Sequence, residues 1–183
     1  MRQRTQEELE AGLAGIRESP AIEGTVELIV RRPGTDERET VAEGRLTPED
    51  GLVGDDWRAR GSRSTPDGSA DPECQLTLMN ARLVDLLADG DREAWPLAGD
   101  QLYVDLDLSE ANLPAGTRLM VGSALVEVTE PPHTGCAKFS ARFGSPALRF
   151  VNSPEGRALR LRGMNARVVQ PGEARPGDAI RRL

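Results

Sequence analysis

The sequence predicts a mainly β fold, either a barrel or a sandwich, with a few short peripheral helices. Apolar residues recur at period two in many short segments, and turn residues separate these segments. No regular helical spacers lie between them, which argues against a parallel α/β sheet. Aromatic residues make up only 3% of the chain, so the core must consist of Leu, Val, Ile and Ala. A length of 183 residues is typical of one compact domain.

A short amphipathic helix is expected near the N-terminus, within residues 5–19. Thr5 and Glu8 have the spacing of a capping box, and apolar residues follow at helical intervals. We therefore interpret residues 1–23 as a helix with its lead-in, and residues 24–183 as the main domain.

The remaining elements are mostly strands. Pro-Gly and Gly-Ser turns punctuate them throughout. The predicted strands are 25–32, 39–46, 75–80, 101–108, 117–122, 124–130, 165–170 and 178–183. Short helices are expected at 80–90, 135–144 and 145–152, and a long exposed loop at 61–73.

Charge and hydropathy narrow the classes of partner. The net charge is -7 and the pI is near 4.9, which argues against binding to duplex nucleic acid or to an anionic membrane. No apolar run approaches the roughly 20 residues that a membrane span needs, and the first ten residues lack the apolar core of a secretion signal. We expect a cytoplasmic protein whose two cysteines are free thiols and whose partner is a small molecule or a protein.

One stretch concentrates the residues that are rare in this chain. "EPPHTGCAKFSARFG", residues 130–144, contains the only histidine, His133, the only lysine, Lys138, and Cys136. Thr134 is a plausible N-cap for a helix that ends at Gly144, and this would place Cys136 in the first turn. The helix N-terminus and the nearby lysine would both favour the thiolate form. The pattern indicates a thiolate that ligates a soft metal or acts as a nucleophile.

A purely structural interpretation of Cys136 stays open. On a helix, Cys136 shares one face with Phe139 and Phe143, so it could be a small core residue. Cys74 leads into a strand among acidic residues and is interpreted as structural. A zinc site built from His133, Cys136 and Cys74 is set aside because a structural site needs four ligands with paired spacing.

Several ordered motifs resemble the MOSC domain, named for the C-terminal domain of molybdenum cofactor sulfurases. They are "GLVGDDWRARGSR", "LAGDQLYVDLDLS", "LPAGTRLMVGSALVEVTEPPHTGCAKF", "RGMNARVVQPG" and "RPGDAI". The resemblance covers about residues 24 to 181. It implies a β-barrel-like fold and a cysteine, matched here by Cys136, that carries sulfur or ligates molybdenum in the pterin of the molybdenum cofactor (molybdopterin).

The chain also departs from the family pattern. Stand-alone reductases of the family usually carry a Gly-Glu-Asn-like motif where this chain has Gly99-Asp100-Gln101. The histidine and lysine around the cysteine are not shared by all members. Pyridoxal phosphate binding is associated with the sulfurases of the family. This sequence contains no such sulfurase domain, so it is not expected to release sulfur from cysteine itself.

A phosphorylated pterin needs cations, and arginine forks suit phosphate oxygens. The alternative is that the candidate arginine and lysine side chains only balance surface acids such as Asp55 and Asp56. The side-chain amides of Gln101 and Asn112 could form hydrogen bonds with the edge of a pterin ring, although amides are also common in strands and turns. The candidate cofactor-binding residues are Arg58, Arg60, Arg63, Gln101, Asn112, His133, Lys138 and Arg142.

Two functions remain open from the sequence. The first is a molybdenum-cofactor-dependent reductase of N-hydroxylated or related N–O or S–O substrates, with Cys136 as catalytic residue and molybdenum ligand. Because the sequence has no flavin, haem or iron–sulfur motif, such an enzyme needs a separate electron-donor protein. The second is a non-catalytic sulfur carrier or cofactor-binding module that uses a persulfide on Cys136.

Overall fold

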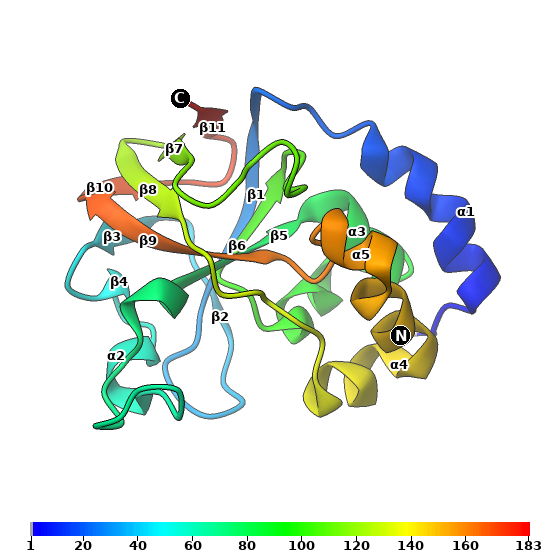
Figure 1. Ribbon diagram of the computed structural model, residues 1–183, viewed down its shortest axis with the longest axis horizontal. Helices are drawn as coiled ribbons and strands as arrows, with labels where there is room; N and C mark the ends of the chain where they lie inside the picture. The colour runs from blue at the N-terminus through cyan, green and yellow to red at the C-terminus, as the bar shows by residue number, and fades with distance from the viewer. Residues whose placement is uncertain (1) are drawn as a thin grey trace.

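Seven strands close into a mixed β-barrel with short helices around it, as the sequence predicts (Figure 1). The computed structural model describes residues 2–183. The strands follow the order β11, β7, β8, β9, β5, β6 and β1, and pairing of β1 with β11 closes the ring. The barrel strands are β1 (Glu23–Arg31), β5 (Leu76–Asn80), β6 (Leu102–Asp105), β7 (Arg118–Val121), β8 (Ala124–Val128), β9 (Met164–Gln170) and β11 (Ala179–Arg182).

The pair β5 and β6 runs parallel, whereas the other neighbouring barrel strands run antiparallel. A parallel pair needs a crossover, and a helical segment supplies it here. That segment contains α3 (Ala81–Leu87) and the 3-10 helix η2 (Arg92–Ala98). The sequence pattern predicts α3 and both strands, but neither their parallel pairing nor η2.

A side sheet is added to the barrel. The predicted strand 39–46 is in fact two strands, β2 (Glu39–Thr40) and β3 (Gly44–Thr47). They separate because β2 pairs with β1, whereas β3 lies between β10 (Gly172–Ala174) and β4 (Gly51–Leu52) in the smaller sheet.

Apolar side chains form two cores on either side of the barrel wall. In β1, Val26 and Ile29 belong to the cluster inside the barrel, whereas Leu28 and Val30 belong to the cluster beneath the helices. A register shift between Val26 and Leu28 accounts for the uneven alternation. The strand period of two thus supplies both cores.

Most of the helices, among them α1, α3, α4 and α5, lie on one side of the barrel, whereas α2 lies apart from them near β4 (Figure 1). Helix α1 (Gln6–Arg17) begins with the predicted capping box and packs against α3 and α4 (Ala137–Asn152). No helix among residues 2–183 is both long enough and apolar enough to cross a bilayer. The remaining helical segments are α1 (Gln6–Arg17), α2 (Trp57–Arg60), η1 (Pro72–Cys74), α4 (Ala137–Asn152) and α5 (Pro154–Ala158).

Gly144 divides α4 into two helices in effect. Its backbone has φ 92° and ψ 163°, which is not helical and strongly favours glycine. The helices predicted at 135–144 and 145–152 are therefore both present, with the break at the predicted residue.

Candidate functional site

The loop that carries Cys136 connects β8 to α4 and is held at both ends. Near its start, the Asn165 side chain donates to the Pro131 carbonyl over 2.9 Å. Near its end, the Gly135 N–H donates to Asn152 Oδ1 over 3.0 Å, and Asn152 Nδ2 donates back to the Gly135 carbonyl over 3.2 Å. These two asparagines fix the course of the loop before the helix begins.

Gly135 allows this close approach. A Cβ at residue 135 would lie 2.8 Å from Leu148 Cδ1 and 3.1 Å from Val151 Cγ2. Because the Asn152 amide ties Gly135 in both directions, the chain stays extended through Cys136, which has φ -122° and ψ 179°. The predicted N-cap, Thr134, is therefore wrong: the N-cap is Cys136, immediately before the first turn.

The environment of Cys136 argues against a place in the core. Phe139 and Phe143 are each only 2% exposed, and their tilted rings pack with centroids 5.1 Å apart, whereas Cys136 is exposed. The Cys136 carbonyl accepts from the Ser140 N–H, so the residue is anchored by its backbone while its thiol faces outward.

Two predicted cations lie on the helix just after the cysteine and share one counterion. Lys138 Nζ lies 3.0 Å from Asp36 Oδ1, and Arg142 Nη2 lies 3.2 Å from the same oxygen. Arg142 also donates to the Leu97 carbonyl over 2.8 Å. Asp36 belongs to the loop between β1 and β2. This loop contacts the helix that follows Cys136, although Asp36 precedes Lys138 by 102 residues and Arg142 by 106 residues in the sequence.

Arg38 adds a third cation that sequence reasoning missed. A Cβ at Gly99 would lie 3.5 Å from Arg38 Nη2 and 3.8 Å from Arg142 Nη1, so both guanidinium groups border this glycine. Arg38 Nε is buried and has no hydrogen-bond partner among the described residues. Burial lowers the pKa of Arg38, and the like charges of Arg142 and Arg32 lower it further. The cluster of Arg38, Lys138 and Arg142 thus has three cations and, among the described residues in ion-pair contact with it, one carboxylate, that of Asp36.

Behind the loop lies a buried ionic network centred on Asp100, which is fully buried. Arg162 Nη1 lies 2.7 Å from Asp100 Oδ2, and His133 Nε2 lies 3.0 Å from Asp100 Oδ1. Burial by itself would raise the pKa of Asp100, but Arg162 and His133 together bring it below its usual value. Asp100 is therefore an ionised acceptor for both partners.

His133 is neutral in this setting. Burial lowers the pKa of His133 and Arg162 lowers it further, which outweighs the opposite effect of Asp100. Since ionised Asp100 can only accept, Nε2 carries the ring proton and donates it. Nδ1 is then a free acceptor, with no hydrogen-bond partner among residues 2–183.

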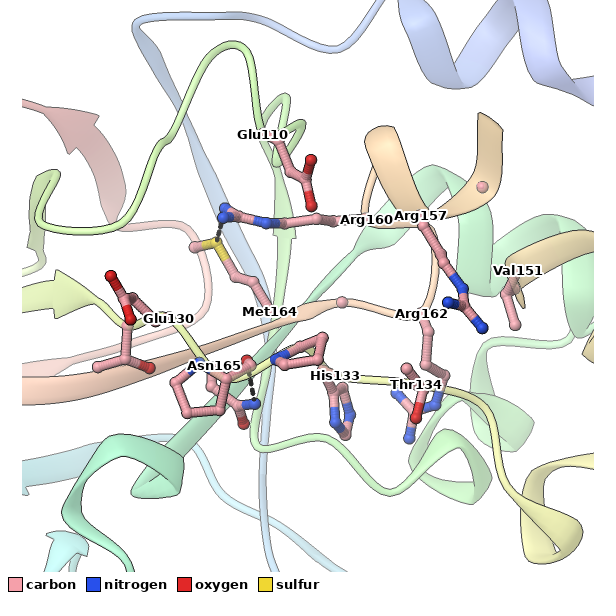
Figure 2. Close-up of a pocket in the computed structure, with 15 residues that line it drawn as sticks. Glu110, Glu130, His133, Thr134, Val151, Arg157, Arg160, Arg162, Met164 and Asn165 are labelled. Atoms are coloured by element: carbon pink, nitrogen blue, oxygen red, sulfur yellow. Dashed lines mark hydrogen bonds between the residues drawn. The ribbon is translucent and has the colours of Figure 1, made fainter. Parts of the chain in front are cut away.

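A pocket of about 280 Å³ opens beside His133. Figure 2 shows the side chains that surround it, from the loop before Cys136 and from the turn between α5 and β9. Cys136 itself does not line this pocket, although His133 and Thr134 do. The charged residues that line it are Glu110, Glu130, Arg157, Arg160 and Arg162.

A family comparison decides the class of the protein. The family model described as MOSC domain matches residues 65–181, well over half of the chain. The chain belongs to the MOSC domain family. Comparison with curated proteins finds no significant match.

Solved structures show the same fold. The MOSC domain is similar to YuaD from Bacillus subtilis, with a TM-score of 0.64 and 14% identity, over 87% of this chain and 94% of that one. It is similar to YiiM from Escherichia coli, with a TM-score of 0.55 and 20% identity, over 87% of this chain and 69% of that one. YiiM from Geobacillus stearothermophilus gives 0.57 and 18%, over 88% and 75%.

The other predicted cations of the MOSC domain lie elsewhere. Arg58 pairs with Asp50 at 3.2 Å and Arg60 pairs with Asp56 at 2.8 Å. Figure 1 shows α2, which carries both arginines, well apart from α4. Arg63 is exposed in the following loop. The structure therefore does not bring these three arginines to Cys136.

The two predicted amides are engaged within the fold. Gln101 is fully buried, and its Oε1 accepts from both the backbone N–H and the hydroxyl of Thr77. Asn112 donates to the carbonyls of Ala21 and Asp107 and accepts from Arg182. In these positions both amides act as structural links, and neither faces Cys136.

The remaining cysteine is only partly exposed. Burial raises the pKa of the Cys74 thiol to about 11, and the adjacent Asp71 and Glu73 contribute. Among residues 2–183, no three His, Cys, Asp or Glu side chains come together as a metal site.

Proposed function

We propose that this MOSC domain binds a molybdenum cofactor through Cys136 and reduces N-hydroxylated or related N–O or S–O compounds. The observation that carries the proposal is an exposed thiol at the start of α4, followed on the same helix by Lys138 and Arg142. Family membership supports a cofactor of this class.

The residues at this end of the barrel fit an anionic pterin. Cys136 supplies one soft ligand, and Arg38, Lys138 and Arg142 supply the positive charge that a phosphate needs. The buried Arg38 Nε without an acceptor is the structural sign that the cation cluster is short of an anion. When bound, the cofactor would supply two-electron redox chemistry.

The protein's own groups would then orient the ligand and manage protons. Asp36 holds Lys138 and Arg142 in place, and a phosphate would compete with its carboxylate for the same donors. His133, in the same loop as Cys136, is neutral and offers Nδ1 as an acceptor, so it can take up a proton at that atom. A separate electron-donor protein would complete the reductase.

A second function follows from the exposure of the thiol. Cys136 faces outward and does not line the pocket next to its loop. This position suits a persulfide that is handed to another protein, because the partner must reach the sulfur. In that case the protein is a non-catalytic sulfur carrier.

One experiment separates the two functions. The protein is purified from a host that makes the cofactor, and it is assayed with a chemically reduced dye as donor and a simple N-hydroxylated amidine as substrate. Sulfane sulfur on Cys136 is measured by mass spectrometry of the same sample. The reductase is supported if the wild-type protein reduces the substrate and Cys136→Ser does not. A persulfide on Cys136 without reduction of the substrate supports the sulfur carrier. If the protein shows neither substrate reduction nor a persulfide, both functions are refuted.

A further inference from the structure

The helix that follows Cys136 already holds one oxyanion, and that oxyanion belongs to the chain itself. A single oxygen of Asp36, Oδ1, accepts from Lys138 Nζ over 3.0 Å and from Arg142 Nη2 over 3.2 Å. Both donors lie in the first part of α4, directly after Cys136. The two cations therefore converge on one position, and the Asp36 carboxylate occupies it.

A third cation acts on the same carboxylate. Lys138 contributes most to lowering the pKa of Asp36, and Arg142 and Arg38 lower it further. Arg38 Nη1 donates to the neighbouring Glu37 carbonyl, whereas its buried Nε has no acceptor among residues 2–183. Three positive charges thus face one negative charge, so the cluster keeps a net positive charge that favours a more highly charged anion.

The loop that carries Asp36 is held firmly at its base and weakly at its tip. At the base, β1 pairs with β2, and the Arg32 N–H donates to Asp55 Oδ2 over 2.9 Å. At the tip, the side chains of Asp36 and Lys138 are 58% and 64% exposed. An ion pair as exposed as this adds little stability, so the tip can leave α4 while the base stays in place.

We propose that Asp36 holds the place of a phosphate group. Residues 33–38 then form a latch, which opens when a phosphate monoester takes the position of the Asp36 carboxylate between α4 and Arg38. A phosphate monoester carries close to two negative charges near neutral pH, so it offsets more of the positive charge than a carboxylate does. Because like charges repel strongly at contact distance, the phosphate and the Asp36 carboxylate cannot both occupy this position.

This inference rests on the proposed function, since it concerns the cations assigned to the phosphate of the cofactor. It adds that the protein contains its own competitor for that phosphate. The competition can be measured on the protein without cofactor, because the latch and all three cations belong to the chain.

The test is a titration of the purified protein with phenyl phosphate, at constant ionic strength and about pH 7. Lys138 is the only lysine, so isotope-labelled lysine gives one side-chain NMR signal that reports directly on the site. Phenyl phosphate should shift this signal in a saturable way. Benzoate, which has the same ring with one negative charge, should bind at least about threefold more weakly. No saturable shift with phenyl phosphate, or equal binding of benzoate, overturns the proposal.

Inorganic phosphate is the second arm, because it separates a site for a phosphate ester from a site for the free ion. Phenyl phosphate should bind at least as tightly, since the phosphate group of an ester is almost fully ionised at this pH. Tighter binding of inorganic phosphate would overturn the assignment to a monoester.

Asp36→Asn tests the latch itself. Asp36 has φ 61°, a left-handed conformation that asparagine also tolerates, so the substitution removes the charge and keeps the backbone. The variant should bind phenyl phosphate about three- to tenfold more tightly than wild type. Glu37→Gln is the matched control, because it removes the same charge from the next residue, which has no ion-pair contact with Lys138 or Arg142. Unchanged affinity in Asp36→Asn, or an equal gain in Glu37→Gln, overturns the latch.

Two further variants assign the cations. Arg38→Gln and Arg142→Gln should each weaken the binding of phenyl phosphate by about tenfold, with the Lys138 signal as the reporter. Arg149→Gln, at an exposed residue near the other end of α4, is the control for the loss of one positive charge and should bind like wild type. Wild-type affinity in both cluster variants overturns the proposal.

The result is distinguishable from a failure of the proposed function. If Asp36→Asn binds phenyl phosphate no more tightly than wild type, the latch is overturned even where molybdenum is retained through Cys136. If the latch is confirmed in a protein that never holds molybdenum, only the proposed function is refuted.

Discussion

At the scale of single residues, the two thiols occupy opposite environments. Cys136 caps a helix and is exposed, whereas Cys74 is half-buried beside acids that, together with burial, raise its pKa to about 11. Because the thiolate is the reactive form, Cys74 is almost entirely unreactive near neutral pH. Reactivity in this chain is therefore concentrated at one residue.

We predict selective alkylation of the folded protein. At about pH 7.5, iodoacetamide should modify Cys136 and leave Cys74 unmodified, as followed by peptide mass spectrometry. In denaturant both cysteines should react at similar rates, which is the control for reagent access. Modification of Cys74 as fast as Cys136 in the folded protein would contradict this view of the site.

The network of His133, Asp100 and Arg162 makes stability depend on pH. Because the pKa of His133 is lowered in the fold, the unfolded chain binds its proton more readily. Stability is then lost as the pH falls from about 6.5, the usual histidine value, toward the lower folded value. Asp100, whose pKa is lowered below the usual carboxyl value, acts with the same sign but at more acidic pH.

His133→Gln should reduce the loss of stability that occurs as the pH falls below the usual histidine pKa. Glutamine can still donate to Asp100 but does not titrate, so the variant should lose less stability than wild type between about pH 7 and pH 5. Urea unfolding at several pH values measures the difference. Parallel curves for the two proteins would show that His133 takes up its proton equally well in the folded and the unfolded state.

At the scale of elements, the loop before α4 depends on a single side chain. Asn152 closes two hydrogen bonds with Gly135, one in each direction. Both partners lie next to Cys136 in space, although Asn152 is at the far end of the same helical segment. The kink at Gly144 lets the second half of α4 fold back to make this contact.

Asn152→Ala should free the loop without unfolding the domain. The loss of two partly buried hydrogen bonds should cost about 1–3 kcal/mol, and hydrogen exchange should accelerate in residues 133–137. Asn112→Ala is the matched control, because it also removes two amide hydrogen bonds, but to Ala21 and Asp107, which do not belong to the Cys136 loop. Unchanged exchange at 133–137 in Asn152→Ala would mean that the loop is held by other contacts.

The sequence predicts an element well where its ends depend on residues close in sequence. The capping box of Thr5 and the glycine break at Gly144 each depend on residues close in sequence. The helix start at Cys136 could not be predicted, because it depends on Asn152 across a folded segment. The split of 39–46 and the parallel pairing of β5 with β6 likewise depend on which distant strand lies alongside.

At the scale of the whole molecule, one barrel wall separates two cores, and α1 belongs to the outer one. Leu9 of α1 is fully buried in the cluster beneath the helices, together with Leu28 of β1 and Phe143 of α4. The proposed division at residues 23 and 24 is therefore a boundary in sequence motif, and the helix before it packs onto the same unit.

Leu9→Ala should show this dependence. Removing a fully buried leucine side chain should cost about 2–5 kcal/mol, in a single unfolding transition. Thermal and urea unfolding measure both quantities, and Leu13→Ala, at a less buried residue of the same helix, should cost less. A negligible loss, or a separate transition for the helix, would mean that α1 is an independent appendage.

Some residues of the candidate site could be predicted from the sequence, and others could not. Cys136, Lys138 and Arg142 could be predicted as one group because they follow one another on a helix. Asp36, Arg38, Asp100 and Arg162 could not, since they come from loops and strands that only the closed barrel brings together. Because the chain uses arginine for almost every positive charge, Arg58, Arg60 and Arg63 give the same sequence signal as Arg142, although only Arg142 lies on the helix that follows Cys136.

The central claim is that this MOSC domain holds the molybdenum cofactor through Cys136. The most direct measurement is the molybdenum content per chain, by elemental mass spectrometry, of wild type, Cys136→Ser and Cys74→Ser purified from a host that makes the cofactor. The account predicts bound molybdenum in wild type and in Cys74→Ser, and its loss in a folded Cys136→Ser. Molybdenum retained by Cys136→Ser, or absent from all three proteins, would contradict it.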